Sequence, residues 1–120
     1  MPILCFDTDG VFYNEKEPHV SGPVKVKDLI PLYLNSDIYI VSESPYYPKD
    51  DEGNPIFHIQ NDKPERYLNL KASVTEFIKW KGGPPSMKLY ISDNGDWREA
   101  EKAGFIYVDA KMFANGIKNE

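Results

Sequence analysis

The chain has 120 residues and a formal net charge of -5, and 41% of its residues are hydrophobic and 28% charged. This length and composition predict one folded domain, and the acidic charge argues against binding to a nucleic-acid backbone, which needs clustered Lys and Arg. The sequence has no apolar run of membrane-spanning length, no signal-peptide pattern and a single cysteine, so we expect a cytoplasmic protein with no disulfide framework and no membrane partner.

The most informative stretch lies at the start of the chain, where the apolar run Ile3–Phe6 leads into Asp7, Asp9 and Gly10. Such a run is typical of a strand buried on both faces, and Cys5 within it is expected in the core. Because side chains alternate along a strand, Asp7 and Asp9 should point to the same side, and Gly10 permits a sharp turn. Two carboxylates held this close repel each other unless a cation lies between them. The pattern therefore indicates a site, although Asp is also common in ordinary turns.

A β-hairpin flap is predicted after this strand, over about residues 11–27. Two short β-like runs flank a segment rich in turn residues there. Asp28 is then expected to cap a short helix over residues 29–34. The flap would project beside the end of the first strand that carries Asp7 and Asp9.

A second buried strand is predicted at Asp37–Val41, and it leads directly into Ser42. Ser42 thus places a hydroxyl at the end of a strand, although an ordinary turn would explain it equally well. Residues 45–63 are expected to form an irregular loop, of a kind that is usually functional or mobile. The short apolar run at 56–59 would add an edge strand or a hairpin.

A helix is predicted after Pro64 from one apolar stripe, formed by Leu70, Val74, Phe77 and Ile78. Asn69 is the expected N-cap and Gly82 the expected end. This start would place Lys71 in the first turn, where a cation opposes the helix dipole unless an anion lies nearby. Lys71 is therefore a candidate ligand for an anion.

A third buried strand is predicted at Lys88–Ile91, and acidic residues follow it closely. The next helix is expected over residues 97–103, and Asp96 and Glu99 have the spacing of a capping box at its start. Asp96 thus has a structural explanation that Asp93 lacks. Asp93 is the better candidate for a functional residue.

A fourth strand at 105–108 and a short helix capped by Asp109 complete the predicted elements. The alternation of strands and helices predicts an α/β fold: a Rossmann-like three-layer sandwich with a mostly parallel sheet and a β-hairpin flap after the first strand. In such sheets, ligands bind at the carboxyl ends of the strands. The candidate residues all follow strands there: Asp7, Asp9, Ser42 and Asp93.

These residues resemble the phosphatase branch of the haloacid dehalogenase superfamily, over nearly the whole chain. The stretch from Asp7 to Val11 resembles the first motif of that family, and Ser42 resembles the second. Lys71 is similar in placement to the lysine of the third motif, and Lys63 is its rival. The segment from Asp93 to Gly104 resembles the fourth, metal-binding motif.

One departure from the family pattern concerns the two acids of the fourth motif. In the family these acids are commonly adjacent or separated by three or four residues, whereas Asp93 and Asp96 have two residues between them. The identity of the metal ligand therefore stays open. We favour Asp93 because it follows the strand directly.

The resemblance implies a single haloacid dehalogenase-like domain over the whole chain, without a separate cap. It also implies hydrolysis of phosphomonoesters through an aspartyl-phosphate intermediate, with Mg²⁺ as cofactor. Asp7 would be the nucleophile and Asp9 the general acid and base. Ser42 and Lys71 would bind the phosphoryl group. Mg²⁺ would be held by Asp7, the backbone carbonyl of Asp9, and Asp93.

The expected partner is a small phosphorylated molecule, such as a nucleotide or a sugar phosphate, and homo-oligomerisation stays open. One alternative is a catalytically weak or inactive relative that keeps the metal site and acts as a binding or regulatory module. Another is a receiver-like phospho-acceptor domain, which also uses strand-end acids and Mg²⁺. The position of Asp7 in the first strand argues against the receiver-like domain.

Overall fold

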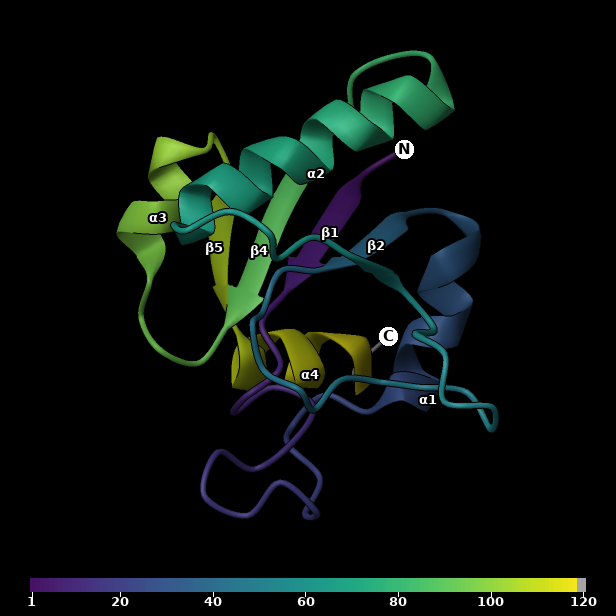
Figure 1. Cartoon of the computed structure of the whole chain (residues 1–120), viewed down its shortest axis with the longest axis vertical. Coiled ribbons are helices and arrows are strands. Elements are labelled where there is room, and N and C mark those ends of the chain that lie inside the picture. Colours follow the sequence, from purple (N-terminus) through teal and green to yellow (C-terminus); the bar gives the residue numbers. More distant parts are fainter. Residues whose placement is uncertain (119–120) are drawn as a thin grey trace.

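The computed structural model describes residues 1–118 and contains a five-stranded sheet between two layers of helices (Figure 1). The strands are β1 (Ile3–Phe6), β2 (Asp37–Ile40), β3 (His58–Ile59), β4 (Lys88–Ser92) and β5 (Ile106–Asp109). Their order is β3-β2-β1-β4-β5, and every neighbouring pair is parallel. The predicted parallel α/β sheet is confirmed, and the short run in the long loop forms an edge strand, β3.

Helices cover both faces of this sheet. They are α1 (Val26–Leu29), the 3-10 helix η1 (Ile30–Leu34), α2 (Arg66–Lys81), α3 (Trp97–Lys102) and α4 (Ala110–Lys118). In Figure 1, α2 and α3 lie on one face, and α1 and α4 lie on the other. Within residues 1–118, no helix combines the length and the apolar character that crossing a membrane requires.

The core is divided by the sheet into two clusters, because side chains alternate along each strand. In β1, Phe6 faces Leu29 of α1, whereas Cys5 faces Leu70 of α2. All three apolar side chains and the thiol are fully buried. Burial raises the pKa of the Cys5 thiol, as expected for a core residue. The central strand is thus apolar on both sides up to the point where the acidic residues begin.

The start of α2 differs from the prediction. The sequence predicts Asn69 as the N-cap, but the helix begins at Arg66, and Asn69 is buried inside it. The Asn69 side chain accepts a hydrogen bond from the backbone N–H of Lys63 at 3.0 Å and donates one to the Lys63 carbonyl at 3.3 Å. This side chain therefore holds the preceding loop. The helix does end at Gly82, with φ 81°, as predicted.

Two other capping predictions are wrong, and one is confirmed. Glu99 does not complete a capping box: its carboxylate accepts a hydrogen bond from the backbone N–H of Tyr67 at 2.9 Å, in the first turn of α2. Asp28 lies inside α1 and does not cap the helix after it. Asp109 does cap α4, since its Oδ1 accepts a bond from the backbone N–H of Lys111 at 2.9 Å. The Glu99 carboxylate thus binds a partner in another helix, which local spacing does not encode.

The segment after β1 contains no regular β-strands. Residues 11–25 form turns with one isolated antiparallel bridge, between Tyr13 and Ser21. Backbone hydrogen bonds from Asn14 to Val20 and from Gly22 to Phe12, both at 2.8 Å, join the two arms of this segment. The segment contains Pro18, Gly22 and Pro23, and proline lacks the N–H that a longer ladder requires. It projects as a loop beyond the carboxyl ends of the strands (Figure 1).

Candidate active site

The four residues predicted at strand ends meet in one place. Asp7 and Asp9 follow β1, Ser42 follows β2 and Asp93 follows β4, and all of them line a cavity of about 350 Å³. The carboxyl ends of parallel strands lie at one edge of the sheet, so the three segments converge. The crossovers change sides next to β1, and ligands of open α/β sheets bind at such a point. The remaining lining residues are Glu15, Glu43, Ser44, Arg66 and Asn94.

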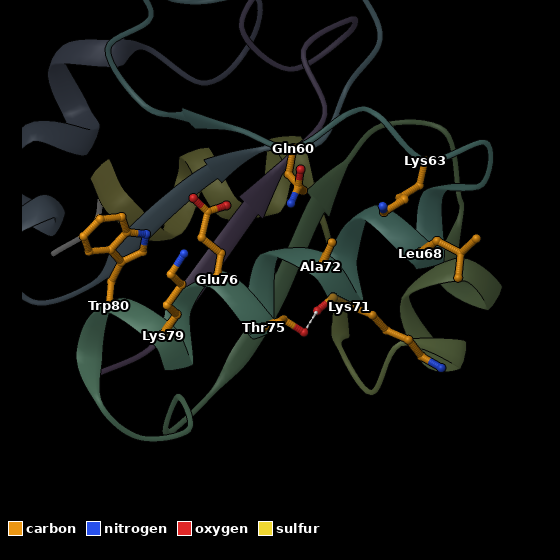
Figure 2. A pocket seen from close by; sticks show the side chains of 9 residues that line it. All are labelled: Gln60, Lys63, Leu68, Lys71, Ala72, Thr75, Glu76, Lys79 and Trp80. Carbon is orange, nitrogen blue, oxygen red and sulfur yellow. Dashed lines mark hydrogen bonds between the residues drawn. The ribbon is translucent and has the colours of Figure 1, made fainter.

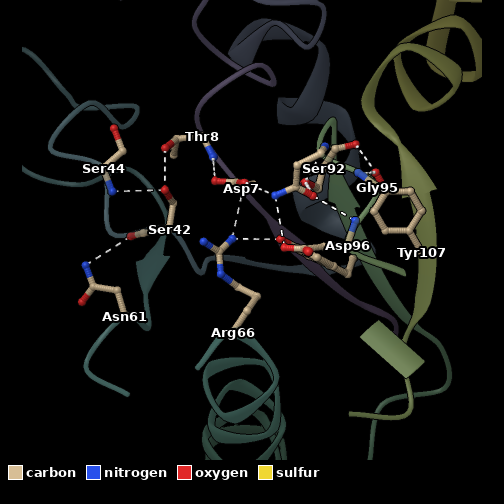
Figure 3. Close-up of polar contacts among 12 residues, drawn as sticks. Asp7, Thr8, Ser42, Ser44, Asn61, Arg66, Ser92, Gly95, Asp96 and Tyr107 are labelled. Carbon is tan, nitrogen blue, oxygen red and sulfur yellow. Dashed lines mark hydrogen bonds and ion pairs between the residues drawn. The ribbon is translucent and has the colours of Figure 1, made fainter. Parts of the chain in front are cut away.

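Asp7 is buried and held in a defined orientation. One carboxylate oxygen, Oδ1, accepts a hydrogen bond from the backbone N–H of Thr8 at 2.7 Å. The other, Oδ2, lies 3.4 Å from Nδ2 of Asn94 and 3.5 Å from Nη1 of Arg66 (Figure 3). The side chain has only 9% of its surface exposed. A carboxylate fixed in this way can act on a ligand without first being ordered.

The cation of the cavity is Arg66, which sequence reasoning missed. It is the first residue of α2, and its Nη1 also donates a hydrogen bond to the Tyr90 hydroxyl at 2.8 Å. Burial alone would lower the pKa of Arg66, but Tyr90 and Asp7 outweigh this effect and raise it. The available sequence signal was Pro64, because proline is common at the start of a helix. A helix start placed there would have put Arg66 at the site.

The two lysines proposed as phosphate ligands lie elsewhere. Lys71 and Lys63 line a separate cavity of about 540 Å³ beside α2 (Figure 2). The ammonium group of Lys71 lies 5.5 Å from the centre of the Tyr67 ring, and that of Lys63 lies 3.6 Å from Asp62. The helix begins at Arg66, before the predicted N-cap Asn69. Lys71 therefore lies about 7.5 Å further along the helix than Arg66, away from the cavity that contains Asp7. Among the three candidate cations, only Arg66 lines the cavity that contains Asp7.

Ser42 is buried with its hydroxyl held from two sides. Its Oγ accepts hydrogen bonds from the Thr8 hydroxyl at 2.8 Å and from the backbone N–H of Ser44 at 3.1 Å (Figure 3). Its carbonyl accepts a bond from Asn61 at 3.2 Å. With both neighbours donating, the hydroxyl keeps its own proton for a ligand in the cavity. Ser42 is thus oriented as a donor.

The loop after β4 is organised by Asn94, a second residue that sequence reasoning missed. Its Oδ1 accepts a hydrogen bond from the Ser92 hydroxyl at 2.6 Å, and its Nδ2 reaches Asp7 and also Asp96, at 3.2 Å. No spacing rule identifies such a bridging amide in a sequence. Asp93 lines the cavity, whereas Asp96 is not among the lining residues and accepts a hydrogen bond from Asn94. This placement favours Asp93 over Asp96 as the ligand of a cation.

The cavity is strongly acidic. Partial burial raises the pKa of Asp93, and the nearby carboxylates of Asp7 and Glu15 raise it further. Around this cavity, the described residues supply one guanidinium and five carboxylates, which belong to Asp7, Asp9, Glu15, Glu43 and Asp93. An anionic ligand would meet repulsion there unless a cation accompanied it.

The donor chemistry of the cavity fits Mg²⁺. Among residues 1–118, no three side chains of His, Cys, Asp or Glu lie close enough together to hold a metal ion by themselves. The expected ligand set needs fewer, because it combines the carboxylates of Asp7 and Asp93 with the main-chain carbonyl of Asp9. These are all oxygen ligands, and Mg²⁺ usually keeps several water molecules besides one or two carboxylates.

Gly10 keeps Asp93 next to the first strand. Its φ is 75°, and a Cβ at this position would overlap the Asp93 carboxylate. We predict that Gly10→Ala lowers the free energy of unfolding by about 2–3 kcal/mol, because backbone strain and a steric clash add together. The measurement is equilibrium unfolding in urea.

Gly53→Ala provides a matched control for that substitution. Gly53 has a φ of 85°, but nothing lies within 4 Å of the added Cβ. It should therefore lose only the backbone contribution, about 1 kcal/mol. Equal losses in the two variants would show that Gly10 and Asp93 are not in close contact.

The cavity therefore combines a fixed carboxylate, a second carboxylate two residues later, an oriented hydroxyl and a partly buried guanidinium. Together these groups can bind the oxygens of an anion, attack it and move a proton. Compared with known proteins, the chain matches no protein-family model, no curated protein and no solved structure.

Proposed function

We propose that this protein is a Mg²⁺-dependent phosphomonoester hydrolase of the haloacid dehalogenase type, acting through an aspartyl-phosphate intermediate. The observation that carries the proposal is the single cavity that joins Asp7, Asp9, Ser42 and Asp93 with Arg66 at the carboxyl edge of the sheet. Each group has a role in phosphoryl transfer, and their motifs resemble those of that family.

The resemblance supplies a role in the reaction for the acidic residues and Ser42, and the placement of Arg66 in the same cavity supports a role for it as the phosphate-binding cation. Asp7 attacks phosphorus, and the bond from phosphorus to the leaving oxygen breaks as Asp9 gives that oxygen a proton. Asp9 then takes a proton from water, which attacks the phosphorus of the aspartyl phosphate and releases phosphate and free Asp7. Ser42 and Arg66 bind the non-bridging oxygens throughout, where their charge and hydrogen bonds stabilise the transition state.

Mg²⁺ completes this proposal. Asp7, the Asp9 carbonyl and Asp93 would hold it. When bound, Mg²⁺ offsets the repulsion between the carboxylates and the anionic ester. The excess of carboxylates over cations in the cavity supports this requirement.

The finer features of the fold belong to the same proposal. The strand order and the crossover point support a Rossmann-like sandwich formed by one domain without a cap. The segment at 11–25 would take the place of the flap, and the substrate would be a small phosphorylated molecule. The cytoplasmic location stays a prediction from composition.

A second candidate function is a binding or regulatory module that keeps the metal site but turns over little or no substrate. One observation favours it: Oδ2 of Asp7 is already engaged by Arg66 at 3.5 Å and by Asn94 at 3.4 Å. Such contacts reduce the negative charge that Oδ2 can offer to phosphorus. This module would bind Mg²⁺ without hydrolysing any ester.

Phosphate release from a broad panel of phosphomonoesters, with Mg²⁺ and with EDTA, separates the two candidates. We expect hydrolysis in Mg²⁺ that EDTA abolishes, and a rise in the thermal unfolding midpoint when Mg²⁺ is added. A thermal shift without turnover on the whole panel would favour the binding module. Absence of both effects would overturn both candidates.

A further inference from the structure

A second cavity adjoins the candidate active site. It has a volume of about 450 Å³, and Glu15 and Asp93 line both cavities. One wall comes from the loop after β1, which projects beyond the strand ends (Figure 1), and the other from the start of α4. Its size lies within the range of pockets that bind small molecules.

The second cavity contains two ammonium groups besides the carboxylates of Glu15 and Asp93. Lys16 from the loop and Lys111 from α4 both line it. In the part of the chain that the structure describes, neither ammonium group has a carboxylate within the ion-pair distance of 4.0 Å. Ammonium groups without a partner are suited to bind an anionic group of a ligand.

The other lining residues are suited to a hydroxylated ligand. Tyr13 and Ser21 supply hydroxyl groups and Asn14 supplies an amide. Besides the lysines and the carboxylates of Glu15 and Asp93, the rest of the wall is formed by Gly10, Gly22 and Pro23. Hydrogen-bonding groups of this kind match the hydroxyls of a sugar or a polyol.

Two consecutive residues, Asp9 and Gly10, connect the candidate active site to the second cavity. Asp9, which would protonate the leaving oxygen, lines the first cavity, and its neighbour Gly10 lines the second. A phosphoryl group held by Asp7, Ser42 and Arg66 would therefore direct the rest of the ester past Asp9 into the second cavity.

We infer that the second cavity binds the leaving group, and that the substrates are phosphomonoesters of small polyhydroxylated molecules that carry a second anionic group. Lys16 and Lys111 bind that second group, and the polar wall binds the hydroxyls. This inference rests on the proposed hydrolase function, because it identifies the alcohol that the reaction releases. The second anionic group is a carboxylate or a second phosphate, which offer the same chemistry to an ammonium group.

Three open-chain phosphate esters test the inference. A fourth ester, p-nitrophenyl phosphate, measures the general hydrolase activity of the protein. Glucitol 6-phosphate has no second charge, 6-phosphogluconate adds a carboxylate, and glucitol 1,6-bisphosphate adds a phosphate. We expect kcat/KM to be about tenfold or more higher for one or both charged probes than for glucitol 6-phosphate, the scale of one hydrogen bond to a charged group. Comparison of the two charged probes identifies which group is preferred.

Substitution of the lysines tests their part in this preference. For each variant, Lys16→Gln and Lys111→Gln, we compare kcat/KM for a charged probe with kcat/KM for glucitol 6-phosphate. This ratio should fall toward one, mainly because KM for the charged probe rises. Lys81→Gln, at the exposed C-terminal end of α2, is the matched control and should keep the ratio of the unmodified protein.

The outcomes separate this inference from the function on which it rests. Absence of Mg²⁺-dependent hydrolysis of all four esters would overturn the hydrolase proposal and the inference with it. Hydrolysis of p-nitrophenyl phosphate with a ratio near one would overturn the inference alone. A high ratio that survives in both lysine variants would overturn the assigned role of Lys16 and Lys111.

Discussion

Asp7→Asn is expected to abolish Mg²⁺-dependent hydrolysis of p-nitrophenyl phosphate, with kcat reduced by about 10⁴-fold or more, as for other enzymes that lose their nucleophile. The amide has nearly the same shape as the carboxylate but carries no negative charge, so it does not attack phosphorus. It would also be a poor ligand for Mg²⁺. Phosphate release at saturating Mg²⁺ measures the effect.

The fold should tolerate this substitution. The amide oxygen can still accept the hydrogen bond that the Asp7 side chain receives from Thr8 at 2.7 Å. Asp62→Asn is the matched control, because Asp62 has 65% of its side chain exposed and pairs only with Lys63 in the described structure. The control should keep its activity within about twofold, since surface ion pairs contribute little. Turnover of Asp7→Asn at the rate of the unmodified protein would exclude Asp7 as the nucleophile.

Arg66→Ala is expected to lower kcat/KM by about 10²- to 10³-fold, the usual cost of removing one charged group that stabilises the transition state. Arg66 is the cation beside Asp7, at 3.5 Å, and is largely buried. The substitution should also lower the free energy of unfolding by about 1–3 kcal/mol, because the Tyr90 hydroxyl loses its 2.8 Å partner. Phosphate release and urea unfolding measure the two effects.

Three further variants test whether the loss of activity is specific to the guanidinium group of Arg66. Arg66→Lys keeps the charge but not the planar fork, so it should recover only part of the activity. Lys71→Ala and Lys63→Ala should stay within about twofold of the unmodified protein, because both lysines line the separate cavity beside α2. A loss in Lys71→Ala as large as that in Arg66→Ala would contradict the placement of the phosphate-binding cation.

The wrong predictions for the starts of α2 and α3 share one cause. Asn69 and Glu99 have the local spacing of helix caps, but Asn69 is buried and holds Lys63, and Glu99 bonds to Tyr67 in another helix. The hydrogen bond from Tyr67 to Glu99 spans 32 positions of the chain. Capping rules consider neighbours three or four residues away, so they do not register such partners. The error in the start of α2 then moved the expected cation from Arg66 to Lys71.

The sequence by itself determined the parallel sheet and the four polar residues at its carboxyl edge. Both follow from short-range regularities: apolar strands alternate with helices, and within three residues of a strand end come Asp7, Asp9, Ser42 and Asp93. Only the tertiary structure decided which cation completes the cavity and which side chains orient Asp7. Those contacts join α2 and the loop after β4 to β1, and the distance between such segments depends on packing of the whole chain.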